Sequence, residues 1–436
     1  MNRILRTMIV ILCTAVLLPA STPVPAKKQE RPIVLIGGTI HTVSGAVIPN
    51  GMLLFENGRI TAVGTSVTVP ANAERIDVTG KHVYPGLINA ASNIGLNEIE
   101  AVRATIDITE TGRINPNVRT DVAVNPESEL IPTTRANGIL VSHVLPGGPL
   151  IAGRTSAMLM DGWTNDEMTL RSPVGLYVSW PNMRVSRSPF ARQSEEEQRK
   201  AIENSLKELR DAFNDARAYL KAKKADKEHR TDLRWEAMAP LFDRTIPMIV
   251  SANEVSQIQS AVQFANEQNV RLIIHGGRDS WKVASLLKEN GVGVIVEPVH
   301  DLPNRRWEEY DLPFTVPARL HEAGVLFAVS GGGNSTMNDR NMAYQAATAS
   351  AYGLPKEEAL RSITINAAKL LGIDAQVGSL ETGKDATLIV TNGDPLEIMT
   401  NVEKAYIQGR PVELRSRHTD LWKKYEEKYR QLGIVK

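Results

Sequence analysis

Short apolar runs separated by turn residues mark both ends of the chain. On the N-terminal side such runs cover residues 33–36, 52–55 and 60–63, and Asn57 with Gly58 supplies a hairpin turn that tolerates positive φ. The same pattern returns near the other end, at residues 386–390 and 402–409. We therefore predict one composite β-sandwich built from residues 27–83 and 374–412.

The middle of the chain alternates between strand-like and helix-like periodicity. The strand-like apolar runs cover residues 138–145, 246–250, 270–274, 293–296 and 324–329. Such alternation is typical of parallel strands joined by crossover helices. Residues 84–373 exceed the roughly 250 residues that an eight-stranded barrel needs. We therefore predict an α/β fold with a (β/α)8 TIM-like barrel over this range, although the pattern does not place its seventh strand.

Two further helices are predicted outside this alternation. Ser194 and Glu197 form a capping box, and apolar residues then recur every three or four positions, which predicts a helical insert over 194–224. This insert either packs on the outer wall of the barrel or serves as a dimer contact or a lid over the site. Residues 413–436 form a C-terminal tail with an amphipathic helix, which we expect to pack against the body of the protein.

The first residues have the pattern of a secretory signal peptide. Arg3 and Arg6 precede an apolar run over residues 8–18, and small residues ending at Ala26 offer a cleavage site. The apolar run is shorter than the roughly 20 residues that span a bilayer. We predict a signal peptide over residues 1–26 and an exported protein, periplasmic or secreted, with no membrane contact after cleavage.

Composition restricts the partners of the mature chain. Its 50 basic and 49 acidic residues give a net charge of +1, which provides no field to attract nucleic acid. The single cysteine, Cys13, lies within the signal peptide. We therefore expect no nucleic-acid partner and no disulfide or thiolate metal ligand in the mature protein.

Residues 83–93, 353–373 and 378–388 carry motifs that resemble those of the amidohydrolase superfamily, in particular of its imidazolonepropionase-like, exported members. Residues 83–93, with sequence VYPGLINAASN, are similar to the first barrel strand of that superfamily. Residues 353–373, and then 378–388, are similar to its last barrel helices and its return into the sandwich. The resemblance implies a site at the carboxyl ends of the barrel strands, where one or two divalent metals activate water for hydrolysis.

Most metal-ligand positions implied by the resemblance are substituted. Strand one carries Ala91 and Asn93 in place of two histidines, and residues 228–281 contain no lysine for strand four. His275 occupies the strand-five position, whereas strand six ends in Glu297 with His300 three residues later. Glycines over residues 331–333 replace the aspartate of strand eight. A zinc site needs three or four protein ligands, so the residues disfavour zinc or another divalent metal, and no cofactor is predicted.

The remaining polar residues define the candidate site. We predict His275 and Glu297 as a catalytic acid/base pair, since such a pair can act without a metal. A loose metal site made by these two residues and His300 is a less favoured alternative. The substrate-binding candidates at the strand ends are Asn93, His143, His300 and Asn334.

Two functions remain open from the sequence. By resemblance the protein is a hydrolase of carbon–nitrogen bonds other than peptide bonds, with a degenerate metal site. Alternatively, it is a catalytically inactive ligand-binding or partner subunit on the same scaffold. Either function implies a small-molecule substrate or ligand, and the second is compatible with a homo-oligomer or with a heteromer that includes an active relative.

Overall fold

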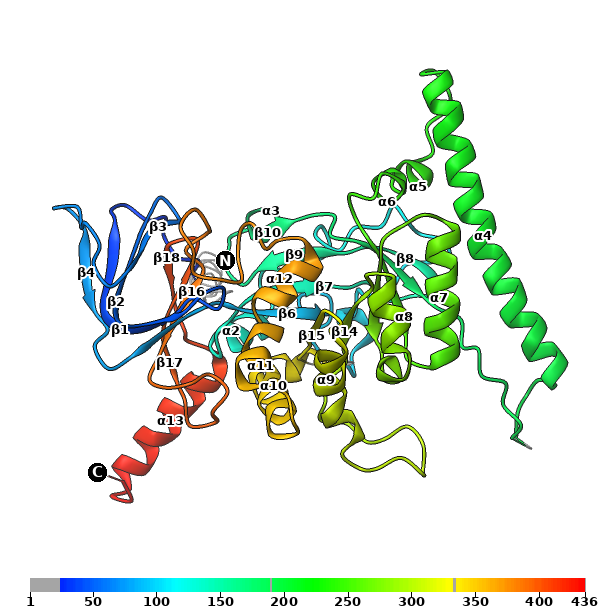
Figure 1. Ribbon diagram of the computed structural model, residues 1–436. Helices are drawn as coiled ribbons and strands as arrows, with labels where there is room; N and C mark the ends of the chain where they lie inside the picture. Colours follow the sequence, from blue (N-terminus) through cyan, green and yellow to red (C-terminus); the bar gives the residue numbers. More distant parts are fainter. Residues whose placement is uncertain (1–23, 189, 332–334, 436) are drawn as a thin grey trace, which may run out of the picture.

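The computed structural model describes residues 24–188, 190–331 and 335–435. Most of the predicted signal peptide, and Asn334 among the candidate site residues, therefore lie outside the described residues. The fold is mixed α/β. Figure 1 shows one large sheet at one end of the molecule, a middle part of strands and helices, and the long helix α4 at the opposite end.

The large sheet contains segments from both ends of the chain. Its strands are β1 (Ile33–His41), β2 (Val47–Glu56), β3 (Arg59–Gly64), β4 (Glu74–Asp77), β5 (His82–Pro85), β16 (Leu388–Thr391), β17 (Val402–Ile407) and β18 (Arg410–Val412). β5 pairs in parallel with β1 and antiparallel with β16, so it joins the N-terminal strands to the C-terminal ones. Phe55 and Tyr406 meet edge to face inside this sheet's own apolar cluster, with ring centroids 5.1 Å apart.

Two smaller sheets form the middle part. One contains β6 (Leu87–Ser92), β7 (Ile139–Val144), β9 (Ser156–Leu159) and β10 (Thr169–Arg171); the other contains β8 (Leu150–Arg154), β11 (Leu176–Ser179), β12 (Met248–Ala252), β13 (Leu272–Gly276), β14 (Gly293–Val296) and β15 (Phe327–Val329). β6 and β7 are parallel, as are β11 to β15, whereas β8, β9 and β10 pair antiparallel.

The two smaller sheets meet between β15 and β6. The Gly331 amide, just after β15, donates a hydrogen bond of 3.0 Å to Oδ1 of Asn89 on β6. β14 pairs directly with β15, and the described residues 297–326 between them form no strand. The strand that sequence periodicity did not place is therefore absent from this part of the chain, and no closed ring of paired strands is traced through the described residues.

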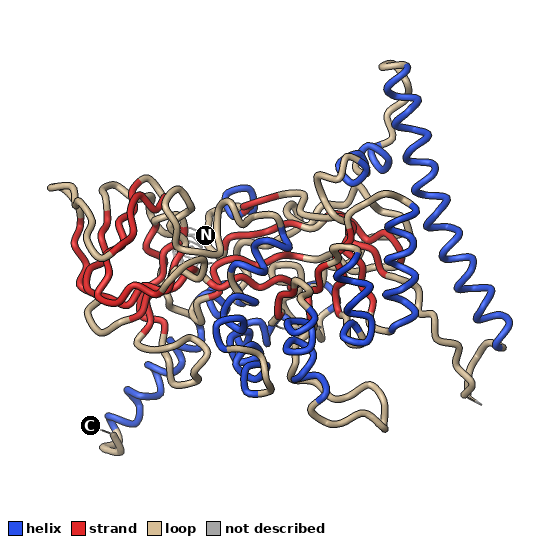
Figure 2. Tube along the Cα trace, viewed as in Figure 1, coloured by secondary structure: helices blue, strands red, loops and turns tan. Residues whose placement is uncertain are grey.

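Helices cover the strands of the middle part (Figure 2). The α-helices are α2 (Leu130–Arg135), α3 (Asn165–Met168), α4 (Glu195–Ala225), α5 (Leu233–Glu236), α6 (Ala239–Phe242), α7 (Val255–Glu267), α8 (Ala284–Glu289), α9 (Leu312–Ala323), α10 (Met342–Ala351), α11 (Lys356–Ser362), α12 (Ile365–Leu371) and α13 (Arg417–Gln431). Short 3-10 turns are η2 (Arg103–Thr105), η3 (Ser280–Val283) and η4 (Thr336–Asn341).

Helix α4 corresponds to the helix predicted over residues 194–224, and Ser194 and Glu197 form its capping box. Its middle packs on the outside of the middle part through Phe213, which makes edge-to-face contacts with Phe242 and Phe264. Both ends of α4 extend past this contact (Figure 1). The packing supports the outer-wall interpretation for the centre of the helix.

Helix α13 does not pack as expected. None of its side chains is buried, and the helix leads away from the large sheet (Figure 1). The prediction that it would pack against the body is wrong. An apolar stripe identifies the helix face that packs against another surface, but it does not identify that surface. Of the helices formed by the described residues, none is both long and apolar enough to span a bilayer.

Candidate functional site

A cavity of about 370 Å³ lies at the carboxyl ends of β13 and β14, where η4 follows β15. Its lining residues are His275, Arg278, Glu297, Pro298, His300, Asp301, Gly331, Ser335, Asn338, Asn341 and Gln345. Carboxyl ends of parallel strands are the usual position of ligand sites in α/β folds. The cavity therefore contains three of the residues that the sequence nominated: His275, Glu297 and His300.

His275 is held by a chain of hydrogen bonds from two neighbouring strands. Burial raises the pKa of Tyr177 to about 12, so its phenol stays protonated, and its oxygen also receives a hydrogen bond from Ser251. Tyr177 Oη lies 2.9 Å from Nδ1 of His275. We assign the phenol as the donor of this hydrogen bond, because the buried hydroxyl keeps its proton and its oxygen already accepts from Ser251. Burial lowers the pKa of His275, with Glu297 opposing the shift, so the ring is neutral near pH 7. Its hydrogen is therefore on Nε2, which leaves a hydrogen-bond donor for the cavity.

Glu297 is hydrogen-bonded to two neighbouring side chains. Oε2 accepts a hydrogen bond of 2.8 Å from Nε of Arg278, and Oε1 accepts one of 3.2 Å from Nδ2 of Asn253. Arg278 also donates to Oδ1 of Asn304 at 2.8 Å and forms an ion pair with Asp301. The structure thus brings His275 and Glu297, the pair predicted from the sequence, to one cavity. The Glu297 carboxylate forms an ion pair with Arg278 there.

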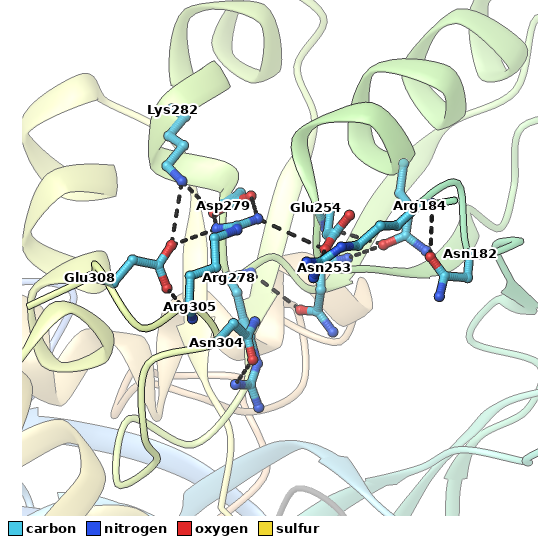
Figure 3. Close-up of polar contacts among 11 residues, drawn as sticks. Asn182, Arg184, Asn253, Glu254, Arg278, Asp279, Lys282, Asn304, Arg305 and Glu308 are labelled. Atoms are coloured by element: carbon cyan, nitrogen blue, oxygen red, sulfur yellow. Dashed lines mark hydrogen bonds and ion pairs between the residues drawn. The ribbon is translucent and has the colours of Figure 1, made fainter. Parts of the chain in front are cut away.

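A second set of charges fixes the loop that closes this side of the cavity (Figure 3). Nη2 of Arg305 lies 2.6 Å from Oδ2 of Asp279, whose side chain is buried, and Arg305 also pairs with Glu308. Nζ of Lys282 lies 2.8 Å from Oδ1 of the same Asp279. These contacts tie the connection between β14 and α9 to the end of β13. Sequence reasoning missed this set, and its only visible signal was the mixed charge of residues 301–309.

The other candidate residues lie at different depths. His143 is fully buried; its Nδ1 donates to the Ala90 carbonyl at 2.8 Å and its Nε2 accepts from Thr155 at 2.7 Å. Nδ2 of Asn93 donates to the Leu145 carbonyl at 2.7 Å. The structure therefore does not bring His143 or Asn93 to the cavity, and both connect strands and loops.

His300 lines the cavity, and its hydrogen-bond partners are on helix α10. Its Nε2 lies 2.7 Å from Oγ1 of Thr348, and its backbone amide donates to Oε1 of Gln345 at 2.8 Å. Burial lowers the pKa of His300. Its imidazole is thus oriented toward α10 rather than combined with His275 and Glu297.

The donor atoms at the strand ends do not fit a divalent metal. Within residues 24–188, 190–331 and 335–435, no three histidine, cysteine, aspartate or glutamate side chains are grouped so that they could hold one. Ala91 offers a methyl group, and Glu297 is paired with Arg278. Three or four converging protein ligands are the minimum for zinc.

Comparisons with known proteins agree with the sequence motifs. The model of the amidohydrolase family matches residues 314–412. The imidazolonepropionase of Symbiobacterium thermophilum is 26% identical over 378 residues, which cover 79% of this chain and 84% of that protein. The crystal structure of an amidohydrolase from Thermotoga maritima aligns with a TM-score of 0.78 and 27% identity, covering 88% of this chain and 100% of that one. The chain belongs to the amidohydrolase superfamily.

The extent of these matches differs along the chain. Amidohydrolase tasK of Hapsidospora irregularis is 23% identical over 387 residues, but the match spans 82% of this chain and only 39% of tasK. The chain thus covers well under half the length of that relative. The amidohydrolase family model begins at residue 314, after the strands that carry His275 and Glu297. The match to the family model therefore includes the cavity residues from Gly331 to Gln345 but not His275 or Glu297.

Proposed function

We propose that this amidohydrolase-superfamily protein binds a small polar molecule in the strand-end cavity and does not perform the metal-dependent hydrolysis of its relatives. The observation that carries this proposal is the state of Glu297. Each of its oxygens accepts one hydrogen bond, from Arg278 or from Asn253, and its charge is already paired with Arg278 before any metal or substrate binds. Together with Ala91, this side chain represents a degenerate metal site.

We also infer that the two smaller sheets are a variant of the superfamily's (β/α)8 barrel and that the large sheet is its accessory β-sandwich. The contact between Gly331 and Asn89 supports closure between β15 and β6. The alignment with the Thermotoga maritima amidohydrolase over 88% of the chain supports the same architecture. On this view β8, β9 and β10 form an antiparallel interruption of the barrel wall.

The cavity favours an uncharged ligand with a hydrogen-bond acceptor. Arg278 pairs with both Glu297 and Asp301, so these three groups together carry one net negative charge, which disfavours an anionic ligand. The remaining polar lining consists of neutral groups, which are Ser335, Asn338, Asn341 and Gln345. Nε2 of His275 would donate to a carbonyl of the ligand. An amide, a cyclic amide or an imidazolone would satisfy this arrangement.

A second candidate function is hydrolysis of such a carbon–nitrogen bond without a metal. It is favoured by the imidazolonepropionase relatives and by His275, whose Nε2–H could donate a hydrogen bond to the scissile carbonyl and stabilise the charge that develops on its oxygen. The two functions share a ligand class and differ in whether the bond breaks.

Metal analysis followed by a substrate panel separates these functions. We expect elemental analysis of the purified protein, before and after incubation with zinc, to find less than stoichiometric bound metal. We expect at least one compound from a panel of amides, cyclic amides and dipeptides to raise the melting temperature, and none of them to be hydrolysed. Tightly bound metal at one equivalent or more would contradict the proposal.

Matched variants assign any binding or turnover to the cavity. His275→Ala removes the donor, whereas His321→Ala on α9 changes a half-exposed histidine outside the cavity. We expect His275→Ala alone to abolish the ligand-induced shift. Turnover that is lost in His275→Ala and kept in His321→Ala would favour the hydrolase. Binding without turnover, lost in His275→Ala and kept in His321→Ala, would support the ligand-binding function.

Export to the periplasm or the medium, and assembly into a homo-oligomer or with an active relative, remain proposals. Export is supported by the basic and apolar pattern of the first 26 residues. N-terminal sequencing of the protein recovered outside the cytoplasm would test it, since cleavage near Ala26 is expected.

A further inference from the structure

Helix α13 presents an aromatic stripe that the described part of the chain does not cover. Leu421, Tyr425, Tyr429 and Leu432 recur every three or four residues, and Trp422 adjoins them, so all five fall on one face at 3.6 residues per turn. Trp422 is 62% exposed and Tyr425 is 48% exposed. An isolated helix of about 15 residues is marginal in water, so a surface that covers this stripe would stabilise it.

Basic side chains border the same stripe. Arg417, Lys424 and Lys428 follow one another at intervals of seven and four residues, along one edge of the aromatic face. Nζ of Lys428 lies 5.8 Å from the centre of the Tyr425 ring. The opposite face instead contains an internal ion pair, between Glu427 and Arg430 at 2.8 Å. Positive charge is therefore concentrated beside the aromatic residues.

A second exposed apolar feature lies at the same end of the large sheet. Ile398 is 74% exposed and Met399 is 84% exposed, in the connection between β16 and β17. β17 and β18 are antiparallel, with Ala405 opposite Val412, so the start of β17 and the end of β18 lie together. The connection before β17 and helix α13 after β18 therefore emerge from one end of the sheet (Figure 1).

We propose that α13 is a peripheral membrane anchor that lies in the surface of an anionic phospholipid bilayer. Helices with an aromatic and leucine face bordered by lysine and arginine bind in the interface, where Trp and Tyr are favoured. Arg417, Lys424 and Lys428 reach the lipid phosphates while their methylene groups stay beside the apolar face. The tip at Ile398 and Met399 provides a second contact. This inference replaces the expectation that the mature chain has no membrane partner.

A second copy of the chain fits the stripe less well. Helix pairs bury aliphatic residues in a seam, whereas Trp and Tyr keep a polar atom that needs a partner. At a bilayer interface the Tyr425 and Tyr429 hydroxyls remain hydrated. The basic edge would also face its own copy in a symmetric antiparallel pair, at a cost in repulsion.

Vesicle flotation tests the anchor. The chain is prepared from Val24 onward, so that the apolar leader cannot bind lipid, and is mixed with vesicles of phosphatidylcholine alone or with phosphatidylglycerol. We expect the protein to bind the anionic vesicles. The triple variant Trp422→Ala, Tyr425→Ala, Tyr429→Ala should bind them roughly tenfold or more weakly. Lys424→Gln with Lys428→Gln should weaken it by about fivefold for each charge removed.

Lys423→Ala with Glu427→Ala is the matched control, because it changes the far face and leaves the net charge unchanged. It should bind as the parent does. All these variants should keep the parent's melting temperature, since none of the residues is buried. The proposal would be overturned if the protein did not float with either vesicle. It would also be overturned if the protein bound both kinds of vesicle equally and the lysine variant did not change that binding. A second contrary result would be a dimer, detected by light scattering, that the aromatic variant dissociates, together with absence of flotation. The aromatic stripe would then be covered by a second copy of the chain.

Discussion

Oη of Tyr177, on β11, lies 2.9 Å from Nδ1 of His275, on β13. The two residues are 98 positions apart in the chain, and both side chains belong to strands that lead into the cavity. Because the phenol donates to Nδ1, the imidazole hydrogen is on Nε2. The same contact determines what His275 offers to a ligand and how readily it takes up a proton.

Replacing Tyr177 with Phe should raise the pKa of His275. The lost hydroxyl donates to the neutral ring, so its removal weakens the neutral form relative to the charged one. The unpartnered Nδ1 should also lower the free energy of unfolding by about 1 kcal/mol. An NMR titration of the histidine resonances, with His275→Gln for assignment, measures the pKa.

Tyr406→Phe provides the control for this substitution, since Tyr406 is buried in the core of the large sheet. It should leave the pKa of His275 unchanged. An identical His275 pKa in the parent and in Tyr177→Phe would show that the phenol does not set the tautomer.

His143 should make the protein less stable as the pH falls below neutrality. Burial lowers the pKa of His143 to about 4. The unfolded chain therefore takes up the proton near pH 6.5 while the folded chain does not, so the free energy of unfolding decreases as the pH falls from 6.5 to about 4. The full effect is about 3 kcal/mol by the same conversion.

Urea unfolding at several pH values measures this slope. His143→Gln removes the titrating group at this position, so the free energy of unfolding of the variant should vary less steeply with pH. Part of the slope should persist, because burial also lowers the pKa of His41 to about 4. Equal slopes in the parent and in His143→Gln would mean that His143 does not contribute.

The elements that local pattern determines could be predicted, and the contacts that build the site could not. Strand-like runs at residues 138–145 and 293–296 appear as β7 and β14, and the capping box of Ser194 begins α4. The antiparallel β8, β9 and β10 were missed, since they depend on pairing partners far away in the chain.

In the site, too, positions set by local pattern could be predicted, whereas contacts between distant residues could not. His275 was identified from its position after an apolar strand, and it lines the cavity. The engagement of Glu297 by Arg278 could not be seen, because the two meet only when β13 and β14 are paired. His143 has the same kind of strand-end position in the sequence, and its burial beneath Thr155 depends on β9 and its neighbours.

Replacing the buried Asn89 with aspartate should destabilise this protein. Asn89 is fully buried; its Oδ1 accepts from the Gly331 amide, and its Nδ2 has no hydrogen-bond partner in the described residues. A carboxylate at this position would therefore be fully buried, with one of its oxygens lacking a hydrogen-bond donor.

We expect Asn89→Asp to lower the free energy of unfolding by about 3 kcal/mol at pH 7. Burial raises the pKa of such a carboxyl, so the penalty should grow as the pH rises above the unfolded value of about 4 and be smaller below it. Urea unfolding at pH 7 and pH 4 checks this, with the exposed Asn392→Asp as control. A penalty that is the same at both pH values would contradict burial of the charge.

The packing of α4 predicts a large cost for truncating Phe213. This side chain is fully buried, and its ring centroid lies 4.9 Å from that of Phe264 and 5.8 Å from that of Phe242. Phe213→Ala should lower the free energy of unfolding by about 3–5 kcal/mol, because it leaves a cavity between the helix and the outer wall. Lys207→Ala, which removes only an exposed ion pair with Asp211, should change it by less than about 0.5 kcal/mol. A cost for Phe213→Ala as small as that of the control would favour the alternative in which α4 opens as a lid, since a helix that leaves the body contributes little to its stability.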